Sequence, residues 1–387
     1  MAILEKGDNH QPREYRGTII LISSVHWHIT WQRHQEIATG LANRGYKVEF
    51  IEPLPKRWPK ASEFRRVMGR LLGQSREAGL VVQKIPPGVT VMSPPLLPDT
   101  GRIAQSINQR YFVPEILKSL LEVCVNRPII TINYLPTMAS LTLQQGIRPD
   151  LAIYDCVIDW KNDPYAQGAE VVENRLVGSV DMVFADSPFL FERMSSIHPI
   201  VKQVLPAVNL EIFNKSIFSK ISSNQTVPIC GYFGGIGASL DVELLREISH
   251  HYRLRLIGPL RISLKGFSNN IEYCGAVSHD QIPQLLQGVD VLLLPYRDAP
   301  HMRAVIPAKT FECLATGIPT VTSGLNSLDQ YADLLYICHS QNEFLKAIEK
   351  ALSEEPSLKE KRIQCAEGNS WSQRIDEIEG YIHQMIH

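Results

Sequence analysis

Apolar runs of a few residues alternate along this chain with longer segments in which apolar residues recur every three or four positions. The first pattern is typical of strands buried on both faces of a parallel sheet, and the second of helices that cover such a sheet. Two such runs, 291–294 and 320–322, flank a helical pattern that starts at Pro307 and ends at Gly317. Proline favours the first helical position, and glycine favours the position after the last. Residues 289–323 are therefore predicted to form a strand, a polar loop, a helix and a second strand.

Two charged residues occupy the first turns of this predicted helix. Lys309 and Glu312 are three positions apart, so they share one face. A helix N-terminus attracts anions, and the ammonium group of Lys309 adds a full positive charge. The Glu312 carboxylate can accept hydrogen bonds from a pair of sugar hydroxyls. Together the two residues suit a nucleoside diphosphate with its ribose, and the alternative is an ordinary surface pair of opposite charges.

The alternation of strands and helices divides the chain into two halves. In the first half, strands are expected at 18–22, 47–51, 89–92, 128–132, 150–155 and 181–187. After a linker at 206–226 the alternation restarts, with strands expected at 229–233, 254–257 and 271–275. Each half is therefore predicted to be an α/β domain with a mostly parallel sheet. The polar residues 1–16 are expected to be frayed, and 371–387 to form an amphipathic helix that reaches back to the first domain.

A small-residue turn follows the strand expected at 229–233. Its residues Gly234, Gly235 and Gly237 would let backbone N–H groups approach a phosphate group closely. The alternative is a plain tight connection between a strand and a helix.

A basic segment lies between Pro53 and Gly79. Its arginines include Arg65, Arg66 and Arg70, and apolar residues recur among them at helical spacing. An amphipathic basic helix of this kind can lie on an anionic membrane surface. The alternative is that its apolar stripe packs on its own domain.

Composition narrows the possible classes of protein. Among the 387 residues, 44% are hydrophobic and 20% charged, as in an ordinary globular protein, and the net charge of −1 argues against a nucleic-acid partner. The seven cysteines are scattered singly, which indicates reduced thiols in the cytoplasm and no zinc site. No window approaches 18 apolar residues, and residues 1–16 carry no apolar signal core. A cytoplasmic protein, with peripheral contact to the inner face of the cell membrane, is expected.

Several sequence motifs resemble those of a known family. In the first half they are W-Q-R-H-Q-E-I-A at 31–38, R-G-Y-K-V-E-F-I-E-P at 44–53, Y-D-C-V-I-D-W at 154–160 and A-D-S-P-F-L-F-E-R at 185–193. In the second half they are G-Y-F-G-G-I at 231–236, L-I-G-P at 256–259 and P-A-K-T-F-E-C-L-A-T-G-I-P-T-V at 307–321. The set resembles bacterial glycosyltransferases of the GT-B fold, in particular family 4 enzymes of cell-surface polysaccharide assembly. Teichuronic-acid-type and glucuronosyltransferase-like enzymes are the nearest members.

This resemblance implies two Rossmann-like domains that face each other across a cleft. They are an acceptor domain at 1–206 and a nucleotide-sugar domain at 207–366, followed by a helix at 367–387 that packs back on the first domain. Glu312 would then bind the donor ribose and Lys309 the diphosphate, with Gly234, Gly235, Gly237, Tyr296 and Arg303 beside them. Neither a metal nor a cofactor is expected, and a UDP-sugar is the expected donor. Many relatives that retain anomeric configuration carry a glutamate eight residues before Glu312, where this chain has Ala304.

A transferase of this kind needs a base if the acceptor hydroxyl attacks directly. Asp155 and Asp159, at the end of a strand in the acceptor domain, are the first candidates, and His26 and His28 in the first loop are the next. Either carboxylate could instead cap the following loop or pair with Arg175. The expected acceptor is a saccharide or a lipid-linked sugar. The alternative functions are a GT-B-fold sugar-nucleotide epimerase and a non-catalytic subunit that binds nucleotide sugars.

Overall fold

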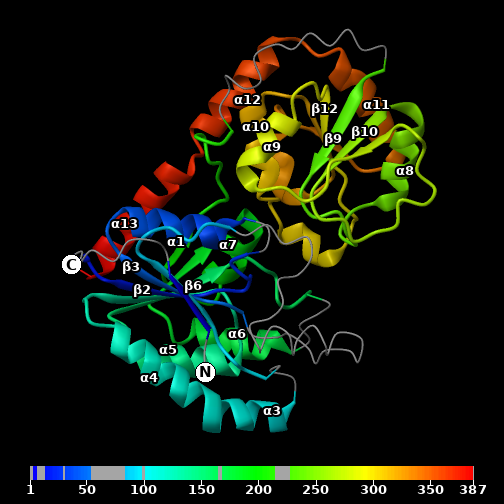
Figure 1. Cartoon of the computed structure of the whole chain (residues 1–387). Coiled ribbons are helices and arrows are strands. Elements are labelled where there is room, and N and C mark those ends of the chain that lie inside the picture. Colours follow the sequence, from blue (N-terminus) through cyan, green and yellow to red (C-terminus); the bar gives the residue numbers. More distant parts are fainter. Residues whose placement is uncertain are drawn as a thin grey trace. The chain divides into compact units, whose positions relative to one another are not determined.

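The computed structural model describes residues 3–6, 14–28, 31–53, 83–97, 101–163, 168–213 and 227–386. The chain divides into two compact units. Unit 1 comprises Met1–Val204 together with Ile375–His387, and unit 2 comprises Leu205–Arg374. Each unit is built on a sheet, mostly parallel in unit 1 and fully parallel in unit 2, with helices on both faces (Figure 1).

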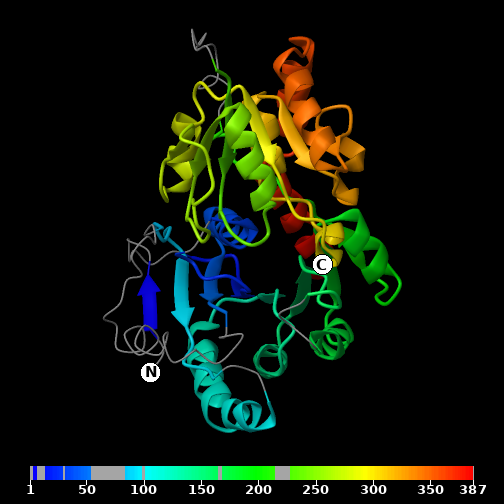
Figure 2. The same cartoon turned by 90° about the vertical axis from the view of Figure 1, so that its right-hand side faces the viewer.

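The sheet of unit 1 has eight strands in the order β1-β4-β3-β2-β5-β6-β7-β8. Their bounds are β1 (Ile3–Lys6), β2 (Thr18–Ile22), β3 (Lys47–Ile51), β4 (Val89–Ser93), β5 (Ile129–Asn133), β6 (Leu151–Cys156), β7 (Met182–Ala185) and β8 (Val201–Gln203). All neighbours pair in parallel except β1, which runs antiparallel to β4 (Figure 2). Every residue of β2, β5, β6 and β7 is buried, which explains their continuous apolar sequences.

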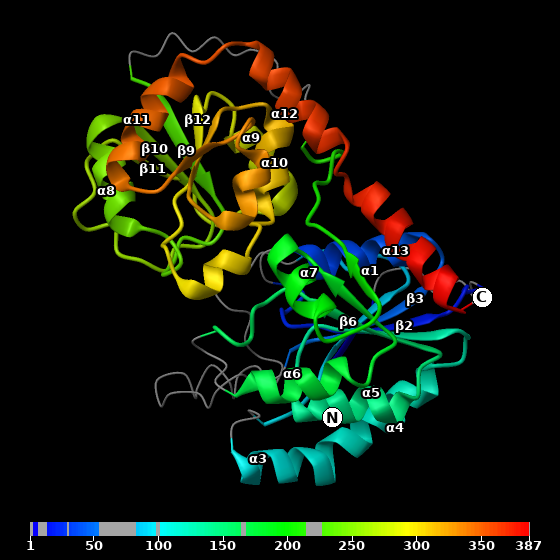
Figure 3. The same ribbon diagram turned by 180° about the vertical axis from the view of Figure 1, so that it is seen from behind.

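Helices cover both faces of this sheet. In Figures 1 and 3, one face carries α1 (Arg33–Asn43), α7 (Pro188–Ser195) and α13 (Trp371–Ile386). The other carries α4 (Val113–Val123), α5 (Met138–Ile147) and α6 (Ala169–Val177). A π-helical turn at Asn108–Phe112 joins α4 to α3 (Arg102–Ile107).

Helix α13 packs against α1 within unit 1. Gly40 of α1 faces Ile375 so closely that a β-carbon at Gly40 would lie 2.5 Å from Ile375 Cγ1. Arg44, one residue beyond the end of α1, forms an ion pair with Asp376, and Arg16 forms another with Glu379. The end of the chain is thereby part of unit 1 rather than of the unit that precedes it.

The sheet of unit 2 has six parallel strands in the order β11-β10-β9-β12-β13-β14. Their bounds are β9 (Ile229–Phe233), β10 (Arg253–Ile257), β11 (Ile271–Tyr273), β12 (Val291–Leu294), β13 (Thr320–Ser323) and β14 (Tyr336–Cys338). The helices are α8 (Val242–His251), α9 (Ile282–Leu285), α10 (Lys309–Thr316), α11 (Gln341–Leu352) and α12 (Ser357–Glu367). Short 3₁₀ helices occupy His279–Gln281, Pro300–Ala304 and Asn326–Tyr331. Helices α8 and α11 pack on one core, while α9, α10 and α12 pack on the other (Figure 3).

Most of the expected elements are present, with several corrections. Residues 3–6 form a strand, although the polar start was expected to be frayed. Helix α10 begins at Lys309, two residues after the expected start at Pro307. Strands β8 and β14, of three residues each, were not expected. The basic segment with Arg65, Arg66 and Arg70 lies outside the described residues.

The sequence also predicted reduced cysteines and the absence of a membrane-spanning helix. All seven cysteines are free. Among the described residues, no helix has both the length and the apolar character needed to cross a bilayer.

Candidate functional site

The sheet of unit 2 changes its direction of winding between β9 and β12. Strand β10 lies on one side of this pair and β13 on the other, so the connections leave in opposite directions. Open α/β sheets bind ligands at this switch point, outside the carboxyl ends of the strands. Tyr232 is near the end of β9, Tyr296 comes two residues after β12, and the N-terminus of α10 follows from the same loop. The expected donor residues therefore gather where the topology favours a ligand.

Lys309 lies between two tyrosines at this switch point. Its Nζ donates to the hydroxyl oxygens of Tyr232 at 3.1 Å and Tyr296 at 3.3 Å. It also lies 4.9 and 5.8 Å from the centroids of the same two rings, within the range of cation–π attraction. Among the described residues no carboxylate forms an ion pair with Lys309. A partly buried cation whose partners in the described part of the chain are neutral phenols is suited to receive an anion.

Tyr296 stays neutral in this arrangement. Burial raises the pKa of its hydroxyl to about 12, although the positive charge of Lys309 acts in the opposite direction. The phenol therefore does not neutralise the ammonium group at physiological pH. The positive charge of Lys309 remains for a ligand.

The glycine turn after β9 fits closely around the Lys309 side chain. Gly234 has a φ of 115°, and a β-carbon there would lie 2.5 Å from Lys309 Nζ. Gly258 has a φ of 129°, and a β-carbon there would clash with the carbonyl oxygen of Gly234. Both positions therefore require glycine. By contrast, β-carbons at Gly235 and Gly237 would meet open space or a single ordinary contact, with Arg261.

Glu312 follows Lys309 by one turn and is held by a residue that the sequence did not single out. His279 Nε2 lies 2.7 Å from Glu312 Oε1, and the two side chains are only 12% and 15% exposed. Because a carboxylate can only accept, His279 must donate from Nε2. In the described part of the chain, Oε2 of Glu312 has no partner. The free oxygen can accept a hydrogen bond from a ligand hydroxyl.

Arg303 is the last of the expected donor residues. It lies in the 3₁₀ helix Pro300–Ala304, and its side chain is outside what the structure describes. Its role stays a prediction. Lys309, Glu312, Tyr296 and the glycine turn thus form the described core of the candidate site.

In unit 1, Asp155 is engaged in a buried ion pair. Arg33 donates from Nε to Oδ2 at 2.8 Å and from Nη2 to Oδ1 at 3.0 Å. Asp155 is fully buried, and Arg33 also donates to the carbonyl oxygen of Val204. This arrangement, which fastens α1 to β6, leaves neither oxygen open to an acceptor hydroxyl. The geometry argues against Asp155 as the base.

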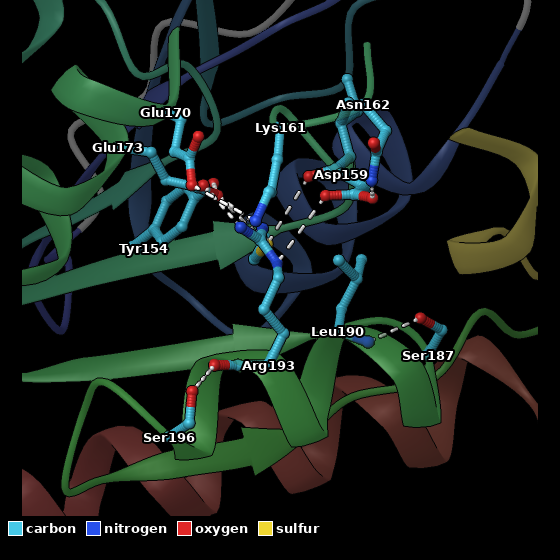
Figure 4. A network of polar contacts seen from close by, with 12 residues as sticks. Tyr154, Asp159, Lys161, Asn162, Glu170, Glu173, Ser187, Leu190, Arg193 and Ser196 are labelled. Carbon is cyan, nitrogen blue, oxygen red and sulfur yellow. Dashed lines mark hydrogen bonds and ion pairs between the residues drawn. The ribbon is translucent and has the colours of Figure 1, made fainter. Parts of the chain in front are cut away.

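Asp159 is also held from several directions (Figure 4). Its Oδ2 accepts from Asn162 Nδ2 at 2.6 Å, and its Oδ1 lies 3.9 Å from Arg193 Nε. Arg193 in turn forms a two-pronged ion pair with Glu173, at 2.7 and 2.8 Å. Asp159 is only 3% exposed. Because it is buried and contacts Asn162 and Arg193, it anchors the loop after β6. The arginine partner is Arg193, whereas Arg175 was the partner considered from the sequence.

His26 has the surroundings that a base requires. It lies in the loop after β2, beside β5, where the sheet of unit 1 also changes its winding direction. Its Nδ1 is 3.2 Å from Glu52 Oε2, and 39% of its side chain is exposed. Among the described residues Nε2 has no partner. His28, two residues later, is partly buried.

Glu52 is fixed as the partner of His26. Its Oε1 accepts from the backbone N–H of Trp27 at 2.9 Å, and Oε2 accepts from Ser93 Oγ at 2.6 Å. Burial by itself would raise the pKa of Glu52. The hydrogen bonds and charge of His26, with Ser93 and Trp27, outweigh that effect and lower the pKa to about 2. An ionised Glu52 directs the second nitrogen of His26 outward.

The partners of these residues come from distant positions in the sequence, which is why the sequence missed them. Glu52 lies in the motif R-G-Y-K-V-E-F-I-E-P and Arg33 in W-Q-R-H-Q-E-I-A, but the sequence assigns neither residue a role. No motif or charge pattern in the sequence marks His279. The described residues contain no group of three or more histidine, cysteine, aspartate or glutamate side chains placed to hold a metal ion.

The chain is similar in sequence to proteins described as glycosyltransferases. Residues 241–380 match the family described as glycosyl transferase-like. The Bacillus subtilis (strain 168) protein TuaH, whose name assigns it to teichuronic acid biosynthesis as a glycosyltransferase, is 23% identical over 264 residues. That match covers 60% of this chain and 66% of TuaH, so the chain spans about two thirds of the length of this relative.

Solved structures resemble the chain over nearly its full length. Sucrose-phosphate synthase from Thermosynechococcus elongatus has a TM-score of 0.68 at 15% identity, covering 96% of this chain and 99% of that one. Anabaena HepE, solved with UDP and glucose, has a TM-score of 0.65 at 13% identity, covering 95% and 100%. Trehalose-6-phosphate from E. coli, as its structure is described, holds UDP-2-fluoro glucose and has a TM-score of 0.61 at 10% identity, covering 96% and 99%. At these identities the likeness establishes the shared fold.

Proposed function

We propose that this chain, a glycosyltransferase of the GT-B type, moves a sugar from a UDP-sugar to a saccharide or lipid-linked acceptor in cell-surface polysaccharide assembly. The observation that carries this proposal is Lys309, a cation at the switch point whose described partners are two neutral tyrosines. Glu312 lies one turn further along the same helix, and its Oε2 has no partner among the residues that the structure describes. A nucleoside diphosphate supplies the anion and the ribose hydroxyls that these two residues lack.

The reaction needs charge stabilisation where the bond to the donor breaks. As the C–O bond between the anomeric carbon and the diphosphate lengthens, negative charge grows on the departing phosphate oxygens. Lys309 and the N-terminus of α10 would stabilise that charge. The hydrogen bonds to Tyr232 and Tyr296 hold the ammonium group before the reaction begins, and the absence of a β-carbon at Gly234 leaves room for it there.

His26 is the base that we propose for the acceptor. In a direct displacement, Nε2 of His26 takes the proton of the acceptor hydroxyl. The oxygen of that hydroxyl bonds to the anomeric carbon as the bond between this carbon and the diphosphate breaks and UDP leaves. Glu52, ionised and hydrogen-bonded at Nδ1, stabilises the imidazolium that results. Asp155 and Asp159 are less suited, because each is buried against an arginine.

The choice of donor and pathway rests on the relatives. Two of the similar structures hold UDP or a UDP-sugar analogue, which supports uracil as the base of the donor nucleotide. The name of TuaH supports a role in a cell-wall polysaccharide. No feature of the site favours an epimerase or a non-catalytic subunit over a transferase.

Nucleotide binding tests the proposal most directly. We expect UDP to bind more tightly than GDP, TDP or ADP in calorimetry, and incubation with UDP-sugars to release UDP. Lys309→Ala should weaken UDP binding by about 1.5–3 kcal/mol, as for a hydrogen bond to a charged group. Lys350→Ala is the matched control, because Lys350 also lies over a tyrosine ring of unit 2, 5.8 Å from the Tyr336 centroid, but is exposed. Equal UDP affinity in all three proteins would refute the role of Lys309, and formation of an epimer without UDP release would refute transfer.

We also propose that the basic segment with Arg65, Arg66 and Arg70 holds the protein reversibly on the cytoplasmic face of the membrane. Each basic residue near an anionic surface contributes about 1 kcal/mol, and salt weakens the attraction. The triple variant Arg65→Glu, Arg66→Glu and Arg70→Glu should no longer sediment with anionic vesicles at low salt, while its UDP affinity is unchanged. Equal, negligible binding of the native protein to anionic and neutral vesicles would exclude membrane docking.

A further inference from the structure

His279 has no place in the proposed reaction, yet it holds the residue that is proposed to bind the ribose. We infer that His279 is a positioning residue that sets the orientation of the Glu312 carboxylate and thereby the preference of the donor site for ribose over sugars lacking its hydroxyls. The inference rests on the proposed function, because it assigns the sugar-recognition part of the same site.

The first observation is the geometry of the pair. A carboxylate on a helix can rotate about its side-chain bonds, and its end can point in several directions. The 2.7 Å contact from His279 Nε2 uses Oε1 and leaves Oε2 without a partner among the described residues. With one oxygen fixed, the direction of the other is fixed as well. A ligand hydroxyl then meets an acceptor that is already oriented, so less side-chain entropy is lost on binding.

The second observation is that His279 is itself held in place. It is the first residue of the 3₁₀ helix His279–Gln281, whose start is closed by a reciprocal cap between Ser278 and Gln281. Gln281 Oε1 accepts from the Ser278 backbone N–H at 3.2 Å and from Ser278 Oγ at 2.9 Å. The imidazole ring lies 5.5 Å from the ring of Phe213, which is fully buried. A capped turn and a buried aromatic ring thus hold the imidazole before any ligand binds.

The third observation is the low exposure of both partners. Side chains that are 12% and 15% exposed are largely shielded from water, so the His279–Glu312 contact competes weakly with solvent. A charge-assisted hydrogen bond in such a place is stronger than one between exposed groups. Removing His279 would leave Glu312 to reorient, and the ribose contact would weaken without loss of the diphosphate contact at Lys309.

The test compares UDP with 2′,3′-dideoxy-UDP, which lacks both ribose hydroxyls, in binding to the native protein and three variants. We expect the native protein to prefer UDP by about tenfold or more. His279→Leu should lower that preference to near unity, mainly through weaker UDP binding, and Glu312→Ala should do the same. His279→Gln places an amide N–H near the position of Nε2 and should keep most of the preference.

The double variant His279→Leu with Glu312→Ala should be no worse than Glu312→Ala alone, because both changes remove one shared interaction. A native protein that binds UDP and dideoxy-UDP equally would refute the ribose role of Glu312, which belongs to the proposed function. Retention of the full preference in His279→Leu would refute the inference while leaving that function standing. Equal loss in the Leu and Gln variants would also overturn it, since ring packing rather than the hydrogen bond would then be responsible. Circular dichroism spectra of each variant show whether it is folded, and His279→Ala replaces the Leu variant if that one is not.

Discussion

His26 and Asp155 both lie at the carboxyl end of the unit 1 sheet, but only one of them has an atom free to take a proton. The carboxylate of Asp155 is completely buried and bound twice by Arg33. The imidazole of His26 is oriented by Glu52 and is 39% exposed. Removing each residue should therefore have a different kind of effect.

His26→Asn should lower turnover by about 10²–10⁴-fold, as for the loss of a general base, with UDP affinity unchanged. Asp155→Ala should instead lower stability by about 3–5 kcal/mol, because it leaves Arg33 buried without its partner. Steady-state rates on folded protein and thermal melting separate the two effects. If Asp155→Ala melts like the native protein but has lost its activity, the roles assigned to these residues must be exchanged.

Asp186, one residue beyond β7, is a carboxylate whose burial costs stability. Burial raises its pKa from 3.8 to about 7, the nearby Asp155 adds to this, and Arg33 opposes it. The folded state therefore binds a proton more tightly than the unfolded state does. The cost is absent below about pH 3.8, grows as the pH rises, and is complete above about pH 7.

Asp186→Asn should accordingly stabilise the protein in a manner that depends on pH. At pH 8 we expect a gain of about 2–4 kcal/mol over the native protein, and at pH 4 almost none. Melting temperatures measured across this range provide the test. A gain that is the same at pH 4 and pH 8 would show that the Asp186 charge is not responsible.

At the scale of elements, the turn after β9 and the start of α10 together form the surroundings of Lys309. Gly234 brings the backbone against the Lys309 side chain, and Tyr232 and Tyr296 complete the enclosure from the ends of β9 and β12. Gly235 belongs to the same turn, but a β-carbon there would meet nothing within 4 Å. The two glycines therefore offer a matched pair of substitutions.

Gly234→Ala should weaken UDP binding by tenfold or more and lower the melting temperature, because a β-carbon at a φ of 115° strains the backbone and displaces Lys309 Nζ from its position. Gly235→Ala should bind UDP like the native protein if the ligand approaches from the Lys309 side. Calorimetry measures the UDP affinity of both variants and so tests the two expectations. Native affinity in Gly234→Ala would show that the enclosure of Lys309 is not needed for binding.

The sequence predicted elements well where several buried residues follow each other, and poorly where few do. Strands such as β2 and β12 are fully buried, so their apolar runs were unmistakable. Strand β8 has three residues that are all only partly buried, and β1 begins a polar stretch. Burial, rather than local preference, generates the pattern on which such predictions depend.

The candidate site was predicted in part for a related reason. Lys309 and Glu312 are three residues apart, so a helix alone brings them together. His279 and Glu312 are 33 residues apart, Arg33 and Asp155 are 122 apart, and only the folded sheet joins them. A single sequence carries no signal for such pairs, and this is why the two roles weighed for the carboxylates of Y-D-C-V-I-D-W, base or structural partner, could not be separated from the sequence.

At the scale of the whole molecule, the packing of α13 on α1 ties the two ends of unit 1 together. Gly40→Ala should destabilise unit 1 by about 1–3 kcal/mol, because the new β-carbon would lie 2.5 Å from Ile375 Cγ1. Adding Ile375→Ala should remove the clash, so the double variant should be more stable than the sum of the single changes predicts. Thermal melting and limited proteolysis of α13 provide the measurement.

Gly380→Ala is the control for this prediction. It lies on α13 itself, where a β-carbon would meet nothing within 4 Å, and alanine favours a helix by about 0.5–1 kcal/mol over glycine. This variant should melt at or slightly above the native temperature. Strictly additive effects of Gly40→Ala and Ile375→Ala would mean that α1 and α13 do not contact each other at Gly40.

The membership of residues 375–386 in unit 1 also sets an order of events during synthesis. The strands of unit 1 are synthesised first, then the whole of unit 2, and only afterwards the segment that packs against Gly40 of α1. Unit 2 is continuous in sequence and can complete its fold while translation proceeds. Until residues 375–386 are synthesised, unit 1 is incomplete and part of its apolar surface stays uncovered. Chaperones that bind exposed apolar surface would therefore bind the N-terminal half of the nascent protein.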